Sequence, residues 1–260
     1  MQDDREILAL RRQVKAADEE FHIALAFHEA WKPAAYDKPL HDRIGRSYAA
    51  NTFRVIAAAL RREMLLALMR LWDNDSRAVR MKSVGESLEK PQVVEVLAAE
   101  AARQWDQPID PSSVADFPEE DRGRMLEAIR RSEAGYGQQV AEIQRTRIAE
   151  TVSLIRKYVD GDGKETLRKL RALRNQRLAH REVVARPAAA PALQSATDQE
   201  VESFFQDTAK LIRLLKGAVE RTSYNPDDTA QIHADNAALF WAGVKGERTV
   251  GHPNYPESLP

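Results

Sequence analysis

The long stretches between prolines most constrain the fold, because they are built from residues that favour helix. Ala, Leu, Glu, Arg and Gln dominate them, and glycine occurs only 11 times in 260 residues. Alternating runs of β-branched residues, which mark half-buried strands, are nearly absent. The sequence therefore predicts an all-α fold.

Helical periodicity, prolines and capping signals predict where the helices begin and end. We expect the first helix to stop before Pro33, and we expect a capping box at 197–200 to open a late helix. The predicted elements are helices over 4–31 and 42–72, a short segment over 83–88, a helix over 91–107, a loop over 106–120, a helix over 119–158 bent near Gly135 or Gly137, a turn at 160–163, a helix from 163 to about 181, a linker over 186–196, and helices over 197–221 and 225–241. We predict a helical domain over 1–222, followed by a short helix and an irregular tail over 223–260.

Composition excludes several classes of function. The chain has no cysteine, so disulfides, thiolate zinc sites and cysteine nucleophiles are excluded. No apolar run approaches the roughly 20 residues that span a bilayer, and the N-terminal residues lack the order of a secretion signal. We therefore expect a soluble cytoplasmic protein. The net charge of −1 argues against a protein that coats nucleic acid with its whole surface.

The helix from 163 to about 181 breaks the usual hydrophobic pattern. On a wheel that advances about 100° per residue, its leucines form one apolar arc. Arg174, Arg177 and His180 fall inside that arc or at its rim, whereas Asn175 falls elsewhere. A helix that places two guanidinium groups and an imidazole on the face it buries is typical of a functional site.

The local charge agrees with this interpretation. Eight basic residues and two acidic ones lie between Lys164 and Arg186. Such a basic segment in a neutral chain suits a partner that carries phosphate. The alternative is structural: a solvated basic helix that ends in a capping histidine would look similar.

The segment resembles the HEPN superfamily of helical bundles, whose motif is an arginine, often a polar residue, and then a histidine. Arg174 and His180 are separated by five residues, Asn175 follows the arginine, and no other histidine has an arginine at such a spacing. The stretch over 53–84, which contains Trp72 and Asp73, and the segment RNQRLAHRE are similar to the AbiU-type abortive-infection branch. The likeness covers roughly residues 45–215.

The resemblance implies a homodimer in which the motif helices of two subunits form one composite site that cleaves RNA without metal or cofactor. It implies that Arg174, Asn175 and His180 are catalytic. Basic neighbours would bind RNA phosphates: Arg171, Arg177 and Arg181. It also implies a role in antiphage abortive infection or toxin–antitoxin defence, with an antitoxin or a nucleotidyltransferase as a further partner.

Two other functions stay open. The chain could be a non-catalytic module that binds RNA, a nucleotide or a nucleotidyltransferase through the same basic face. It could also be a scaffold in which the motif is only a polar dimer seam.

Smaller signals are expected to be structural. Glu19 and His22 lack the second Glu-x-x-His of a di-metal helix, and the turn at 160–163 lacks the later ligands of a calcium loop. Asp73 and Arg77 are spaced for a helix-end ion pair, or would orient the motif helix. The four tryptophans are expected in the core or at a dimer contact.

Overall fold

The computed structural model describes residues 2–45, 47–73, 80–103, 105, 110–133, 135–174 and 196–255. Within these ranges the chain is almost entirely helical, and the β-structure consists of one isolated bridge between Trp72 and Arg80. The predicted all-α class is confirmed. The elements are α1 Gln2–Tyr36, α2 Lys38–Ile44, α3 Ala49–Leu71, α4 Met81–Leu88, α5 Pro91–Ala102, η1 Pro111–Val114, α6 Glu119–Glu133, α7 Tyr136–Val159, α8 Lys164–Leu173, α9 Asp198–Leu215, the π-helical segment η3 Lys216–Glu220, and α10 Pro226–Gly243.

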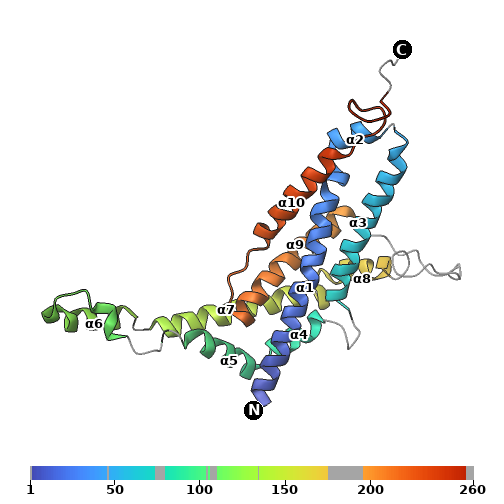
Figure 1. Ribbon diagram of the computed structural model, residues 1–260. Coiled ribbons are helices and arrows are strands. Elements are labelled where there is room, and N and C mark those ends of the chain that lie inside the picture. The colour runs from blue at the N-terminus through green and yellow to red at the C-terminus, as the bar shows by residue number, and fades with distance from the viewer. Residues whose placement is uncertain are drawn as a thin grey trace.

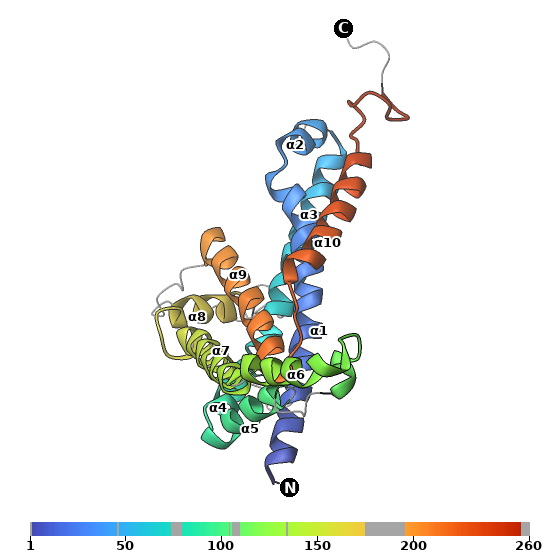
Figure 2. The same cartoon turned by 90° about the vertical axis from the view of Figure 1, so that its left-hand side faces the viewer.

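Helix α1 is the spine of an elongated, two-armed molecule (Figure 1). Helices α3 and α10 pack along α1, and together with α2 they form an upper arm. Helices α4, α5, α7, α8 and α9 gather around the lower half of α1, and α6 projects beyond them (Figures 1 and 2). The described chain begins at the lower end of the molecule, with the start of α1, and α10 ends near the upper end (Figures 1 and 2).

The main core forms where α1 meets the lower group of helices. Its largest fully buried side chains include Phe21 of α1, Leu68 of α3 and Phe204 of α9. Because α3 carries apolar residues around much of its circumference, it contributes to this core over its whole second half. This core supports α8, the helix that carries the predicted motif.

A second, smaller core holds the upper arm together. It contains Ala34, Leu40, Phe53 and Trp241, from four different helices. The indole Nε1–H of Trp241 donates to the carbonyl oxygen of Ala30 at 2.9 Å, which ties α10 to α1. The chain after α10 is held to the same arm, since the Tyr48 N–H donates to the Glu247 carboxylate and the Thr249 hydroxyl donates to the Arg43 carbonyl oxygen.

The start of the chain departs from the predicted boundaries. Helix α1 does not stop before Pro33 but runs through it to Tyr36. Ala34 is buried in the upper core, so tertiary packing outweighs the one hydrogen bond that proline cannot donate. The helix predicted over 42–72 is two helices, because α2 ends at Ile44 and α3 begins only at Ala49.

The helix predicted over 119–158 is also two helices. It breaks at Gly135, whose φ of 88° lies in the left-handed region that glycine adopts without steric cost. The predicted bend is thus a complete interruption. Helix α5 is shorter than predicted and ends at Ala102, and the loop over 106–120 contains the short helix η1.

The later boundaries agree with the sequence. The capping box is present: the Thr197 hydroxyl accepts from the Glu200 N–H, and the Glu200 carboxylate accepts from the Thr197 N–H. Asn225 caps α10, and the described part of the tail after Gly243 is irregular.

Three of the four tryptophans, Trp31, Trp72 and Trp241, are buried, whereas Trp105 is exposed and stacks on Tyr136. None of the helices in the described ranges has the length and apolar character that crossing a membrane requires.

Candidate active site

The position of α8 is fixed by its leucine face and by the turn before it. Leu167 and Leu170 are almost fully buried in the main core. The Gly163 N–H donates to the Lys157 carbonyl oxygen at 3.0 Å. A β-carbon at Gly163 would lie 2.7 Å from the Tyr158 ring, so only glycine allows this close approach of α8 to α7. The motif helix therefore begins at a tightly packed turn between α7 and α8.

Arg174 lies at the C-terminal end of α8 and forms an ion pair with Asp73. Its Nη1 donates to Asp73 Oδ2 at 2.7 Å. The two side chains are 22% and 26% exposed, so the pair is partly buried but remains within reach of solvent. Asp73 directly follows α3 and Trp72, so it does occupy the orienting position that the sequence offered as one alternative. Arg77, its other predicted partner, lies outside the described residues.

Arg171 lies one turn before Arg174 and is also anchored to the end of α3. Its Nη2 donates to the carbonyl oxygen of Trp72 at 2.6 Å. Burial lowers the pKa of the Arg171 guanidinium, the charge of Arg174 lowers it further, and Asp73 opposes this effect. Among the described residues, the end of α8 thus brings the Arg171 and Arg174 guanidinium groups close to the Asp73 carboxylate.

The structure describes two of the six predicted site residues. It brings Arg171 and Arg174 together against the end of α3. The other four lie outside the described residues: Asn175, Arg177, His180 and Arg181. Their predicted roles stay predictions, as does the continuation of the motif helix to 181.

In the described part of this region, acidic side chains from elsewhere in the chain offset some of the positive charge that the sequence count gives. Acidic groups from distant parts of the chain reach it, because Asp73 pairs with Arg174 and Glu200 of α9 pairs with Lys169 at 2.7 Å. The hydrogen bond from Lys169, together with one from the Thr197 backbone, lowers the pKa of the Glu200 carboxyl.

Comparison with known proteins identifies the family. The family model described as HEPN AbiU2 matches residues 7–240. The chain belongs to the AbiU2 family of HEPN proteins. This confirms the predicted HEPN-like helical bundle and the resemblance to the abortive-infection branch, and extends it beyond 45–215. No curated protein and no solved structure matches the chain.

The sequence of this HEPN chain did not predict the polar contacts that join α7 to α9 beside the start of α8. The Tyr158 hydroxyl donates to Asp207 Oδ2 at 2.7 Å, and Lys157 Nζ lies 2.6 Å from the same oxygen. Burial raises the pKa of Tyr158, and the bond to Asp207 adds to this effect. The Tyr158 ring also packs edge-on against Trp72, which links α7 to the residue before Asp73. No short motif marks these residues, since they are brought together only by the packing of α7 on α9.

The weaker metal signals have structural explanations in the described residues. His22 Nδ1 lies 2.8 Å from the Asp18 carbonyl oxygen, and its Nε2 lies 3.3 Å from the Tyr224 hydroxyl. In the part of the chain described, no three His, Asp or Glu side chains gather as metal ligands. His28 is buried on α1, where it stacks on Phe205 with 3.8 Å between ring centres.

Proposed function

We propose that this HEPN protein is a metal-independent endoribonuclease of abortive-infection defence, with Arg174 and His180 as its catalytic pair. The observation that carries the proposal is the placement of Arg174. The motif arginine of a HEPN-family chain is held at the end of α8, partly buried, with Arg171 beside it. A guanidinium fixed in this way suits the recognition of a phosphate group.

The residue types account for the chemistry. His180 takes the proton of a ribose 2′-hydroxyl, and the 2′-oxygen attacks the adjacent phosphorus while the bond to the 5′-oxygen breaks. A protonated His180 imidazole of the site gives a proton to the leaving 5′-oxygen, so the products are a 2′,3′-cyclic phosphate and a 5′-hydroxyl. Arg174 stabilises the charge that develops on the phosphoryl oxygens, and Asn175 orients the histidine or the phosphate. Arg171, Arg177 and Arg181 bind neighbouring phosphates.

Asp73 acts through Arg174 as a positioning residue. It holds the guanidinium at 2.7 Å and limits the rotamers that the arginine samples. A side chain that a neighbouring residue holds in place, as Asp73 holds Arg174, keeps a better defined position in a site.

A homodimer completes the site in this proposal. The motif helices of two subunits face each other, so that two Arg174–His180 pairs flank one RNA strand. An antitoxin or a nucleotidyltransferase would regulate the dimer by covering this face.

A non-catalytic binding module is the second candidate. Two observations favour it: the net charge of the chain is −1, and Asp73 and Glu200 neutralise part of the basic segment. Such a module would bind RNA, a nucleotide or a nucleotidyltransferase without cutting RNA.

An RNA cleavage assay in EDTA distinguishes the two candidates. Purified wild type and His180→Ala are incubated with tRNA and total RNA, and the 3′ ends of the products are analysed. We expect cleavage by the wild type that leaves 2′,3′-cyclic phosphates, and a loss of about 10²-fold or more in the variant. A folded, dimeric wild type that binds RNA without cutting it would instead support the binding module.

A further inference from the structure

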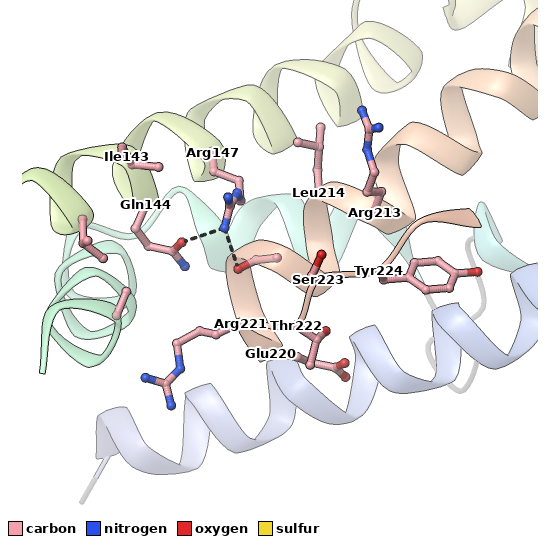
Figure 3. Close-up of a pocket in the computed structure, with 13 residues that line it drawn as sticks. Ile143, Gln144, Arg147, Arg213, Leu214, Glu220, Arg221, Thr222, Ser223 and Tyr224 are labelled. Atoms are coloured by element: carbon pink, nitrogen blue, oxygen red, sulfur yellow. Dashed lines mark hydrogen bonds between the residues drawn. The ribbon is translucent and has the colours of Figure 1, made fainter. Parts of the chain in front are cut away.

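A pocket that the proposed function does not use lies away from α8. It has a volume of about 710 Å³ and opens between α5, the first half of α7 and the segment over 213–224 (Figure 3). Helix α8 begins beyond the other end of α7 (Figure 1). A partner in this pocket therefore occupies a surface separate from the end of α8, where Arg174 lies.

Three arginines from different segments line the pocket: Arg147, Arg213 and Arg221. Arg147 lies over the middle of the lining, and Arg213 and Arg221 lie toward its two ends (Figure 3). Arg147 Nη1 donates to the Gly217 carbonyl oxygen at 3.2 Å, and Arg221 Nη1 donates to that of Glu100 at 2.5 Å. These two acceptors carry no net charge, so the hydrogen bonds hold the guanidinium groups without neutralising them.

The positive charge of the pocket is not balanced by the described part of the chain. Among the described residues, no carboxylate forms an ion pair with any of the three arginines, whereas Arg156 on the same α7 pairs with Glu89. The lining also contains one carboxylate, that of Glu220, which lies 3.4 Å from Lys216. The pocket therefore attracts acidic groups of a binding partner.

An apolar stripe on α7 leads up to this charge. Tyr136, Val140 and Ile143 precede Arg147 at intervals of four, three and four residues, so the four side chains lie within about 60° of one another around the helix axis. Tyr136 is 44% exposed and Ile143 is 58% exposed, and the exposed Trp105 stacks on Tyr136. Apolar residues at this spacing are the ones that pack against a second helix lying along the first.

The groups beside the stripe are held in place by the fold. Arg221 adopts a left-handed conformation, with φ 57° and ψ 30°, directly after the π-helical segment η3. A β-carbon at Gly217 would lie 3.1 Å from the Arg147 side chain, so the glycine makes room for that arginine. Gln144 is buried, donates to the Ala218 carbonyl oxygen and accepts from Arg147 at 3.5 Å. A surface fixed in this way loses less entropy when a partner binds.

We propose that this pocket docks an acidic amphipathic helix of another protein. The helix lies along α7, with its apolar residues on the stripe and its carboxylates on the three arginines. A helix that docks in a groove uses apolar side chains at i, i+3 or i+4, and i+7, which matches the spacing of the stripe. Arginine suits carboxylates because its planar guanidinium donates to both oxygens at once.

The arrangement of the arginines favours a helix over smaller or more polar partners. A compact anion reaches only part of the charge, because the arginines lie at the middle and toward both ends of the lining (Figure 3). An RNA strand matches the arginines, but Val140 and Ile143 are aliphatic and give its bases no ring to stack on. The proposal does not depend on RNA cleavage, because its charge and its stripe lie at the pocket itself.

Selection from a random library of displayed peptides tests the proposal. The peptides have about 16 residues, enough for four helical turns. They are selected on the full chain and counter-selected on the double variant Ile143→Ser/Arg213→Gln, which changes two exposed side chains and therefore keeps the fold. The enriched peptides are then titrated by fluorescence anisotropy against wild type, Arg147→Gln, each single variant and Arg156→Gln. The last is the matched control, since it removes one charge from α7 outside the pocket.

We expect the enriched peptides to combine several carboxylates with apolar residues at helical spacing. Binding should weaken about tenfold in Arg147→Gln and about threefold or more in Ile143→Ser and Arg213→Gln, while Arg156→Gln stays within about twofold of wild type.

Four results would overturn the proposal. They are no enrichment that depends on the pocket, enriched peptides without acidic residues, and displacement of the peptide by a 2′-O-methylated RNA strand that binds with the same dependence on Arg147. The fourth is a sedimentation mass that falls in the double variant, which would assign the pocket to a second copy of this chain.

Discussion

At the scale of single residues, the pair of Arg174 and Asp73 connects the motif to the fold. The sequence predicts the arginine from its place in the motif, and offers Asp73 as a residue that orients the motif helix. The structure adds the contact itself, at 2.7 Å, and the anchoring of Arg171 on the Trp72 carbonyl. Contacts between residues about a hundred positions apart depend on tertiary packing, so spacing along the chain does not reveal them.

Removing the charge of Asp73 should destabilise the protein. Asp73→Asn removes the carboxylate that accepts from Arg174 at 2.7 Å, at a partly buried position that also holds Arg171. We expect the free energy of unfolding to fall by about 1–3 kcal/mol, because the partly buried ion pair between Asp73 and Arg174 is lost. Urea denaturation measures the change. Glu165→Gln is the control, since it removes an exposed partner of Arg168 on the same helix and should leave the midpoint unchanged. Equal midpoints for Asp73→Asn and wild type would show that the pair contributes nothing.

The buried His28 should make stability depend on acid pH through its two carboxylates. His28 Nδ1 lies 2.9 Å from Glu29, and its Nε2 lies 2.9 Å from Glu202. Burial acts to raise the pKa of Glu29, but hydrogen bonds from His28 and Lys32 outweigh it, so the pKa lies below 4.5. The pKa of Glu202 is lowered in the same way, with bonds from Gln206 and His28 outweighing burial.

The sign follows from the lowered pKa values. Just below the ordinary pKa of a glutamate, the unfolded chain binds more protons than the folded chain. The stability that Glu29 and Glu202 contribute is therefore present above about pH 4.5 and is lost as the pH falls. We expect Glu29→Gln to flatten the slope of melting temperature against pH between about pH 3 and pH 5. Glu127→Gln, on the exposed face of α6, should keep the wild-type slope. A Glu29→Gln curve parallel to the wild type would contradict this account.

At the scale of helices, the sequence predicted which segments are helical better than where they end. The capping box at Thr197 and the start of the last helix at Asn225 were predicted correctly, because these signals act within one turn. The predicted end of the first helix before Pro33 was wrong, because the burial of Ala34 keeps the chain helical as far as Tyr36. The break before Ala49 was missed because the helical period continues across it. Gly135 was recognised, but the left-handed conformation that it adopts ends the helix outright.

The capping box should contribute measurably to stability, because α9 lies in the main core. Thr197→Ala removes the oxygen that accepts from the Glu200 N–H at 3.1 Å. We expect a loss of about 1 kcal/mol in the free energy of unfolding, measured by urea denaturation. Thr197→Ser keeps the hydroxyl and should stay within about 0.5 kcal/mol of wild type. If serine and alanine destabilise equally, the cap is not the source of the effect.

At the scale of the whole molecule, the sequence predicted the all-α class and the HEPN family, but not the shape. Helix α1 belongs both to the upper arm and to the lower group of helices. This shape depends on how α3, α9 and α10 pack on α1 (Figure 2). The pocket between α5, α7 and η3 also has no counterpart in the sequence, because its arginines are spread over Arg147, Arg213 and Arg221.

The proposed composite site requires two chains. Sedimentation velocity on the purified protein should give a mass of about twice the 29.3 kDa of one chain. His180→Ala should leave that mass unchanged if the histidine serves catalysis, whereas a polar dimer seam predicts a shift toward monomer. A wild type that stays monomeric at micromolar concentration would contradict the composite site.

The most direct test of the central claim is the rate of RNA cleavage in EDTA by Arg174→Ala relative to wild type. Arg168→Ala, which removes an exposed arginine from the same helix, is the matched control. We predict that the rate falls by about 10²-fold or more for Arg174→Ala and stays within about twofold for Arg168→Ala, because only the first removes a group that stabilises the transition state. Equal rates for wild type and a folded Arg174→Ala, or no cleavage by the wild type, would contradict the assignment of Arg174 to catalysis.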